Sequence, residues 1–160
     1  MGLIQNHTFD NCESIACKRK ILVVDDDKAI RDVVLGMLLS MGCETIGAED
    51  ALEGLNIFHS HDCNIIVTDM DMPGMDGLHF AAHIKEISPS TPVVLMTGQA
   101  REHILEKVKG SYIDWILFKP FGLEELEETI QHLAIDKGYF ESRPDYHESV
   151  LQNHEKILTT

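Results

Sequence analysis

Between residues 20 and 136, short apolar runs alternate with longer segments in which apolar residues recur every three or four positions. The runs are bounded by charged or turn-forming residues, and they predict buried strands in KILVVDDD, CETIGA, CNIIVTD, PVVLMTG and DWILFK. The segments that follow them have a helical period, which predicts helices over 28–41, 50–58, 77–87, 100–109 and 123–135. A strand therefore precedes each predicted helix.

Aspartates at the helix starts support this prediction. Asp27 and Asp50 stand where an N-cap is expected, because a carboxylate there can accept hydrogen bonds from the free N–H groups of the first turn. In the helix that follows Asp50, the spacing predicts that Leu52, Leu55 and Phe58 face the interior.

The repeated alternation predicts an α/β fold of the doubly wound (βα)5 kind, with a five-stranded parallel sheet and helices on both of its faces. Parallel neighbours need crossover connections, and these are right-handed. In such sheets the functional site lies beyond the carboxyl ends of the strands, at the point where the strand order reverses.

Charge is concentrated in the same central segment. The formal net charge is −14. Residues 1–20 carry three basic and two acidic groups, and residues 137–160 carry three basic and four acidic groups. This leaves 7 of the 13 basic and 21 of the 27 acidic groups in residues 21–136, which therefore hold the whole −14. Such a surface repels phosphate backbones, so direct binding of nucleic acid is not expected, whereas basic partners and cations suit it.

The chain is expected in the cytoplasm. No apolar run reaches the roughly 18 to 20 residues of a membrane span, and the first residues lack the pattern of a secretory signal. The four cysteines, at positions 12, 17, 43 and 63, form no Cys-x-x-Cys pair, and we interpret them as reduced thiols.

Residues of complementary chemistry end four of the five predicted strands. Asp25 and Asp26 end the first, Asp69 the third, Thr97 the fourth and Lys119 the fifth. Carboxylates brought together repel one another unless a cation lies among them, and their hard oxygens suit Mg²⁺. Mg²⁺, an ammonium and a hydroxyl around one carboxylate can stabilise a phosphoryl group in transfer, which would make Asp69 the nucleophile. Each residue alone is most often a turn former or a surface residue, but their combination favours function.

The motifs ILVVDDD, VTDMDMPGMDG, PVVLMTG and FKPF resemble, in this order and spacing, the receiver domain of bacterial-type two-component response regulators. The resemblance covers about residues 20–136 and rests on the combination of motifs. It implies a receiver domain at 19–136 with the flavodoxin-like strand order 2-1-3-4-5. It also implies a phosphoacceptor that takes a phosphoryl group from a sensor histidine kinase or a histidine phosphotransfer protein and then contacts a downstream protein target.

The same resemblance implies a Mg²⁺ site. Asp26 would bind the metal directly and Asp25 partly through water. Asp69, the phosphoacceptor, and the backbone carbonyl of Asp71 would complete the site.

Further roles follow from the resemblance. Thr97 and Lys119 would contact oxygens of the phosphoryl group, and the Lys119–Pro120 peptide would be cis. Asp71 and Gln99, each two residues beyond a site residue, would face the entrance and influence how water reaches the phosphoryl group.

Two segments flank the predicted domain. Residues 1–18 show no clear period and are expected to be a mobile extension. Residues 137–160 contain apolar positions at helical spacing, which predicts a short amphipathic helix as a C-terminal extension. These 24 residues are too few for a helix-turn-helix unit, so a stand-alone receiver is expected. A dimer could form through this C-terminal helix or through the face of the fourth helix and fifth strand.

Three alternatives to the phosphoacceptor function stay open. Asp71 has the spacing of a second acid, as in a Mg²⁺-dependent phosphatase with an aspartyl-phosphate intermediate. A receiver-like scaffold would not be phosphorylated at all. The chain could also be the receiver fragment of a DNA-binding regulator. We expect no enzyme beyond self-catalysed phosphoryl acceptance and autodephosphorylation.

One position departs from the family's pattern. The family often has an aromatic residue three positions before the lysine, and here that position is Ile116, with Trp115 and Phe118 nearby but expected to point differently. We therefore expect phosphorylation to move Thr97 while changing the surface of the fourth helix and fifth strand less than usual. An NMR chemical-shift map of the phosphorylated protein checks this, and large shifts on that surface would contradict it.

Overall fold

Strands and helices alternate along the part of the chain that the computed structural model describes, residues 19–135. The strands are β1 (Lys20–Val24), β2 (Glu44–Ala48), β3 (Ile65–Asp69), β4 (Val93–Thr97) and β5 (Trp115–Phe118). The helices are α1 (Lys28–Ser40), α2 (Ala51–Ser60), α3 (Gly77–Ile87), α4 (Arg101–Val108) and α5 (Leu123–Ile135). The predicted alternation is confirmed, while the expectations for residues 1–18 and 137–160 lie outside the described residues.

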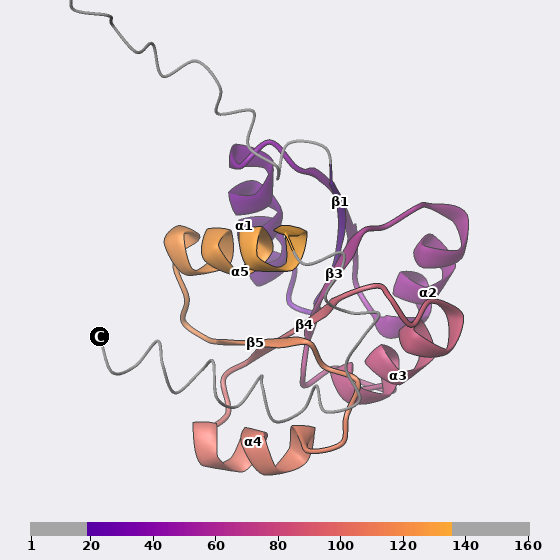
Figure 1. The fold of residues 1–160 in the computed structure, drawn as a ribbon, viewed down its shortest axis with the longest axis vertical. Coiled ribbons are helices and arrows are strands. Elements are labelled where there is room, and N and C mark those ends of the chain that lie inside the picture. Colours follow the sequence, from indigo (N-terminus) through magenta and orange to yellow (C-terminus); the bar gives the residue numbers. More distant parts are fainter. Residues whose placement is uncertain (1–18, 136–160) are drawn as a thin grey trace, which may run out of the picture.

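The five strands form one parallel sheet in the order β2-β1-β3-β4-β5 (Figure 1), as the resemblance implied. The chain leaves β1 to form β2 on one side and returns to form β3 on the other. The strand order therefore reverses between β1 and β3, and a site is expected where these two strands end. No helix in the described part is long and apolar enough to cross a bilayer.

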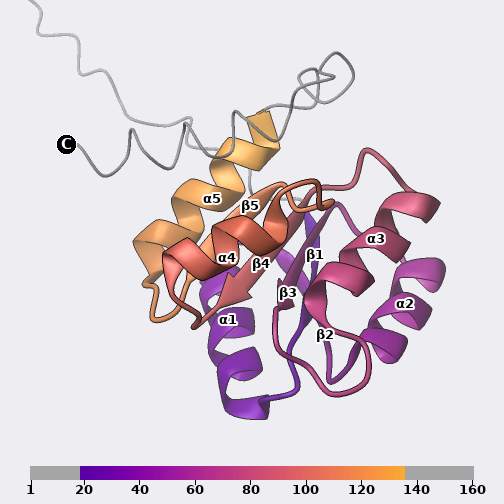
Figure 2. The ribbon, with the colours of Figure 1, turned by 90° about the horizontal axis from the view of Figure 1, so that it is seen from below.

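The sheet separates two apolar cores, because successive side chains of a strand point to opposite faces. In β1, Ile21 and Val23 pack with α1 and α5, whereas Leu22 and Val24 pack with α2, α3 and α4. Figures 1 and 2 show α1 and α5 together on one side of the sheet and α2 and α3 on the other. Every residue of β3 and β4 is buried, so the strand ends are firmly supported.

The expected N-caps are confirmed. Asp27 accepts hydrogen bonds from the N–H groups of Ala29 and Ile30 at 2.9 and 3.2 Å, and Asp50 accepts one from Glu53 at 2.8 Å. Asp76 caps α3 in the same way through the N–H of His79.

The expected inward position of Leu52 is wrong, because this side chain is 68% exposed. Helix α2 instead turns its smallest residues, Ala51 and Gly54, towards the core. A Cβ atom on Gly54 would lie 3.0 Å from the ring of Phe80, so the helix approaches α3 closely at this point. Leu55 and Phe58 pack against the core as expected.

A buried ion pair joins the end of α3 to the amino ends of β4 and β5. The Nζ atom of Lys85, near the end of α3, lies 2.7 Å from Oδ2 of Asp114, which also accepts a hydrogen bond from the N–H of Val93 at 2.6 Å. The ion pair ties α3 to the edge of the sheet opposite the expected site.

Gly77 lets α3 start directly against the end of β3. Its N–H donates to the carbonyl of Met70 at 3.0 Å. A Cβ atom here would overlap the carbonyl oxygen of Asp69 and lie 2.9 Å from Cδ1 of Leu95. The close approach therefore requires glycine.

Gly77→Ala should reduce the free energy of unfolding by about 1–3 kcal/mol, because backbone must move to admit the methyl group. Gly36→Ala is the matched control, since Gly36 lies inside α1 with no atom within 4 Å of its added Cβ. The control should gain about 0.5–1 kcal/mol, because alanine favours the helix. Urea unfolding of both variants measures the difference, and an equal gain in Gly77→Ala would contradict the close contact.

Candidate functional site

Three carboxylates meet where β1 and β3 end. Val24 pairs with Thr68 in the register of these strands, so Asp25 and Asp69 are the next residues on neighbouring strands. Oxygens of Asp25, Asp26 and Asp69 all lie within 4.8 Å of one another. Asp25 is 1% and Asp69 is 7% exposed, whereas Asp26 is exposed.

Lys119 supplies a positive charge to this group. Its Nζ donates to Oδ1 of Asp69 at 2.6 Å and to Oδ2 of Asp25 at 3.2 Å. The backbone N–H of Lys119 donates to the carbonyl of Thr97 at 2.7 Å, which fixes the start of the long side chain. The Lys119–Pro120 peptide is cis, as expected.

The pKa values of this group reflect burial and mutual charge. Burial raises the pKa of Asp69 above its ordinary value, and the charge of Asp25 raises it further, although Lys119 opposes both effects. Burial alone would lower the pKa of Lys119, but its hydrogen bonds and the charges of Asp69 and Asp25 raise it instead. Lys119 therefore stays an ammonium ion at neutral pH, and Asp69 ionises less readily than an exposed aspartate.

The group fits a hard divalent cation. One lysine faces three carboxylates, so negative charge is in excess and oxygen ligands are at hand. Both oxygens of Asp25 already accept hydrogen bonds, Oδ1 from the N–H of Asp27 at 2.9 Å and Oδ2 from Lys119. This is compatible with a contact through water, whereas exposed Asp26 can offer its carboxylate directly.

Thr97 and Asp71 lie next to the group. Asp69 pairs with Met96, so buried Thr97 is one residue further along the neighbouring strand. The N–H of Asp71 donates to Oδ2 of Asp69 at 3.1 Å. The Asp71 carboxylate is outside the group of three and accepts both of its bonds, at 2.8 and 3.0 Å, from Nε2 of Gln99.

One of the two aromatic residues near Ile116 points in a direction that was not expected. Ile116 is buried in the core beneath α2, α3 and α4, and Trp115 points to the opposite face, 4.9 Å from the ring of His132. Phe118, however, packs on the same face as Ile116, because residues two apart in a strand share a face. The guanidinium of Arg101 lies 4.6 Å from the centre of the Phe118 ring.

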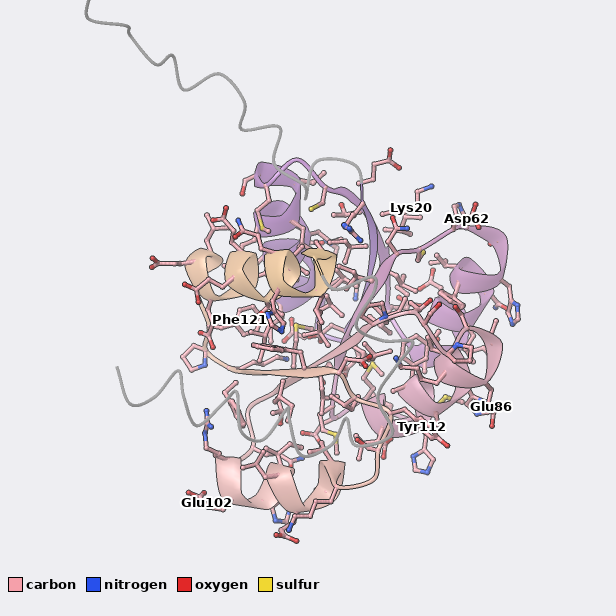
Figure 3. All side chains as sticks on the ribbon, viewed as in Figure 1. Lys20, Asp62, Glu86, Glu102, Tyr112 and Phe121 are labelled. Carbon is pink, nitrogen blue, oxygen red and sulfur yellow. The ribbon has the colours of Figure 1, made fainter. Side chains whose placement is uncertain are left out.

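Two contacts at this edge were not predicted. Nη1 of Arg31 donates to the carbonyl of Asp25 at 2.6 Å, and Nζ of Lys107 donates to Oε1 of Gln99 at 3.0 Å. Both basic residues lie on predicted helices, and the sequence does not indicate that their partners are a backbone carbonyl and the side-chain amide of a loop residue. Other charged side chains, among them those of Asp62, Glu86 and Glu102, lie at the periphery of the molecule (Figure 3).

Comparisons with known proteins agree with this geometry. The family model of the response regulator receiver domain matches residues 21–131. Protein PilG of Pseudomonas aeruginosa is 37% identical over 116 residues, which cover 70% of this chain and 84% of that protein. Response regulator MprA of Mycobacterium sp. is 35% identical over 109 residues and 67% of this chain, and the match spans 46% of MprA, about half of its length.

Solved structures give the same result. The chemotaxis protein CheY4 of Vibrio cholerae superimposes with a TM-score of 0.69 at 30% identity, over 72% of this chain and 98% of that one. A response regulator receiver domain protein of Clostridium thermocellum gives a TM-score of 0.70 at 28% identity, over 76% and 98%. Sequence, fold and site geometry agree, and the chain belongs to the family of response regulator receiver domains.

Proposed function

We propose that the chain is the phosphoacceptor of a two-component or phosphorelay system and that Asp69 receives the phosphoryl group. The observation that carries this proposal is the position of Asp69, whose buried carboxylate is held by Lys119 beside the carboxylates of Asp25 and Asp26. A nucleophile, a fixed ammonium and cation ligands at one point are what phosphoryl transfer requires.

The proposed donor is a phosphohistidine of a sensor kinase or a phosphotransfer protein. A carboxylate oxygen of Asp69 bonds to phosphorus as the bond from phosphorus to the donor's imidazole nitrogen breaks. The bonding electrons return to that nitrogen, which takes up a proton from solvent as the neutral imidazole leaves. Lys119 can then move its hydrogen bond to a phosphoryl oxygen, and the hydroxyl of Thr97 can donate to another.

Mg²⁺ is the proposed cofactor and would neutralise charge on the phosphoryl oxygens. The side chains of Asp25, Asp26 and Asp69 would hold it, together with the backbone carbonyl of Asp71. The N–H of Asp71 binds Asp69, so its main chain already lies beside the acceptor.

In this proposal the receiver acts in the cytoplasm and passes on the signal by contact with a downstream protein, or by transfer to another histidine. It catalyses only its own phosphorylation and dephosphorylation. A phosphatase would need Asp71 as a proton donor to its leaving group, but both oxygens of this carboxylate already accept hydrogen bonds from Gln99.

Acetyl phosphate with Mg²⁺ should add the mass of one phosphoryl group to the wild type and none to Asp69→Asn, because the amide is not a nucleophile. Asp76→Asn is the matched control and should be phosphorylated, since asparagine caps a helix as well as aspartate does. Intact-mass spectrometry of the three proteins, with and without Mg²⁺, measures this.

A wild type that gains no mass calls for a second measurement with beryllofluoride, which mimics the phosphoryl group. Binding of beryllofluoride would show that the acyl phosphate is too short-lived to detect. Without such binding, the proposed function is wrong and the chain is a scaffold.

Mg²⁺ should raise the midpoint of thermal unfolding, because an ion that binds only the folded protein stabilises it by mass action. Asp26→Asn should lose most of this increase. Asp27→Asn, one residue further on, should keep it, since Asp27 caps α1 and lies outside the group of three carboxylates. Equal increases in both variants would contradict the proposed ligands.

A further inference from the structure

A chain of side-chain hydrogen bonds joins α4 to the loop after β3. Nζ of Lys107 donates to Oε1 of Gln99 at 3.0 Å, and Nε2 of Gln99 donates to both oxygens of Asp71, at 2.8 and 3.0 Å. Lys107 lies in the last turn of α4, Gln99 in the loop after β4, and Asp71 in the loop after β3. We call these three side chains the clasp.

The clasp is attached to the site at two points. The N–H of Asp71 donates to Oδ2 of Asp69 at 3.1 Å, and the N–H of Gln99 donates to Oγ1 of Thr97 at 3.1 Å. The backbone of each loop is therefore bonded to a site residue, while its side chain is bonded to the other loop. A change in the clasp should consequently alter the surroundings of the acceptor, Asp69.

Lys107 and Asp71 hold the Gln99 amide in one orientation from its two ends. An amide has donors at nitrogen and an acceptor at oxygen, and the two ends differ little in shape. An ammonium requires the oxygen on its side, which leaves the nitrogen to face the carboxylate of Asp71. Without Lys107 the amide is held only by its exposed bonds to Asp71, and the Gln99 side chain can move away from that carboxylate.

We propose that Lys107 is a positioning residue that prolongs the phosphorylated state, because it holds Gln99 against Asp71 and so withholds the Asp71 carboxylate from water. This inference rests on the proposed function of Asp69. The clasp is built from this chain's own residues and differs from the aromatic residue that Ile116 replaces.

The step that the clasp slows is hydrolysis of the aspartyl phosphate. A water oxygen bonds to phosphorus, and the bond between phosphorus and the Asp69 oxygen breaks with its electron pair returning to the carboxylate. The proton lost by water passes to solvent, and the products are the free carboxylate and inorganic phosphate. A carboxylate next to the acceptor, once free of Gln99, can accept a hydrogen bond from that water and so orient it for attack.

The experiment compares the rate of phosphoryl loss after acetyl phosphate is removed. Lys107→Met should lose the phosphoryl group about two to five times faster than the wild type, the effect expected of exposed polar contacts. Lys107→Arg should keep the wild-type rate, because it retains a donor. Lys109→Met is the matched control, since Lys109 follows the same helix and pairs with Glu106 instead.

A double-mutant cycle separates positioning from general destabilisation. If Lys107 acts through Gln99, Gln99→Ala should itself speed the loss, and Lys107→Met should add nothing in the Gln99→Ala background. An effect of Lys107→Met that persists there would overturn the proposal. So would a Lys107→Met rate equal to that of Lys109→Met.

The contact can also be measured without phosphorylation. The side-chain amide signals of Gln99 in a ¹⁵N NMR spectrum should shift in Lys107→Met and stay in place in Lys109→Met. If they stay in both, the clasp does not exist in solution and the inference is wrong. Absence of both phosphorylation and beryllofluoride binding in the wild type, with shifted amide signals, would instead contradict the function proposed for Asp69.

Discussion

The arrangement of this domain depends on one ammonium ion placed between two buried carboxylates. Asp25 and Asp69 are almost inaccessible to solvent, and two such charges side by side are unfavourable without a counter-charge. Lys119 provides that charge from a strand that is not adjacent to either carboxylate's strand, because β4 lies between β3 and β5. The ends of β1, β3 and β5 must therefore be held in register for the site to form at all.

That register is maintained by packing on both faces of the sheet. The wholly buried strands β3 and β4 run through the middle of the molecule, and Gly77 allows α3 to rest directly on the end of β3. At the other edge, the ion pair of Lys85 and Asp114 fixes α3 to β4 and β5. The charged groups of the site therefore follow strands that are fixed by packing. They differ in exposure, since Asp25 and Asp69 are buried whereas Asp26 is exposed.

Features that are determined by residues close together in the sequence could be predicted, whereas most features that depend on residues far apart in the sequence could not. Continuous apolar runs and the caps at Asp27 and Asp50 are local signals, and the corresponding elements were predicted correctly. The meeting of the strand-end residues follows from the parallel topology, which the alternation implies. Leu52 was placed wrongly because close packing of Gly54 on Phe80 rotates α2, and this is a tertiary effect. The clasp involving Lys107 was not predicted, because side-chain contacts of α4 and two separate loops leave no periodic pattern in the sequence.

The separation of the interior into two cores has a further consequence. A side chain of a given strand contributes to one core or to the other, so α1 and α5 share no apolar core with α2, α3 and α4. The sheet therefore separates the two cores. A movement of side chains in one core can reach the other only through the backbone of the strands and the loops at their ends. Residues on the two outer surfaces can accordingly diverge independently, one surface adapting to one binding partner while the other adapts to a different one, without disturbing the shared chemistry at the carboxyl edge.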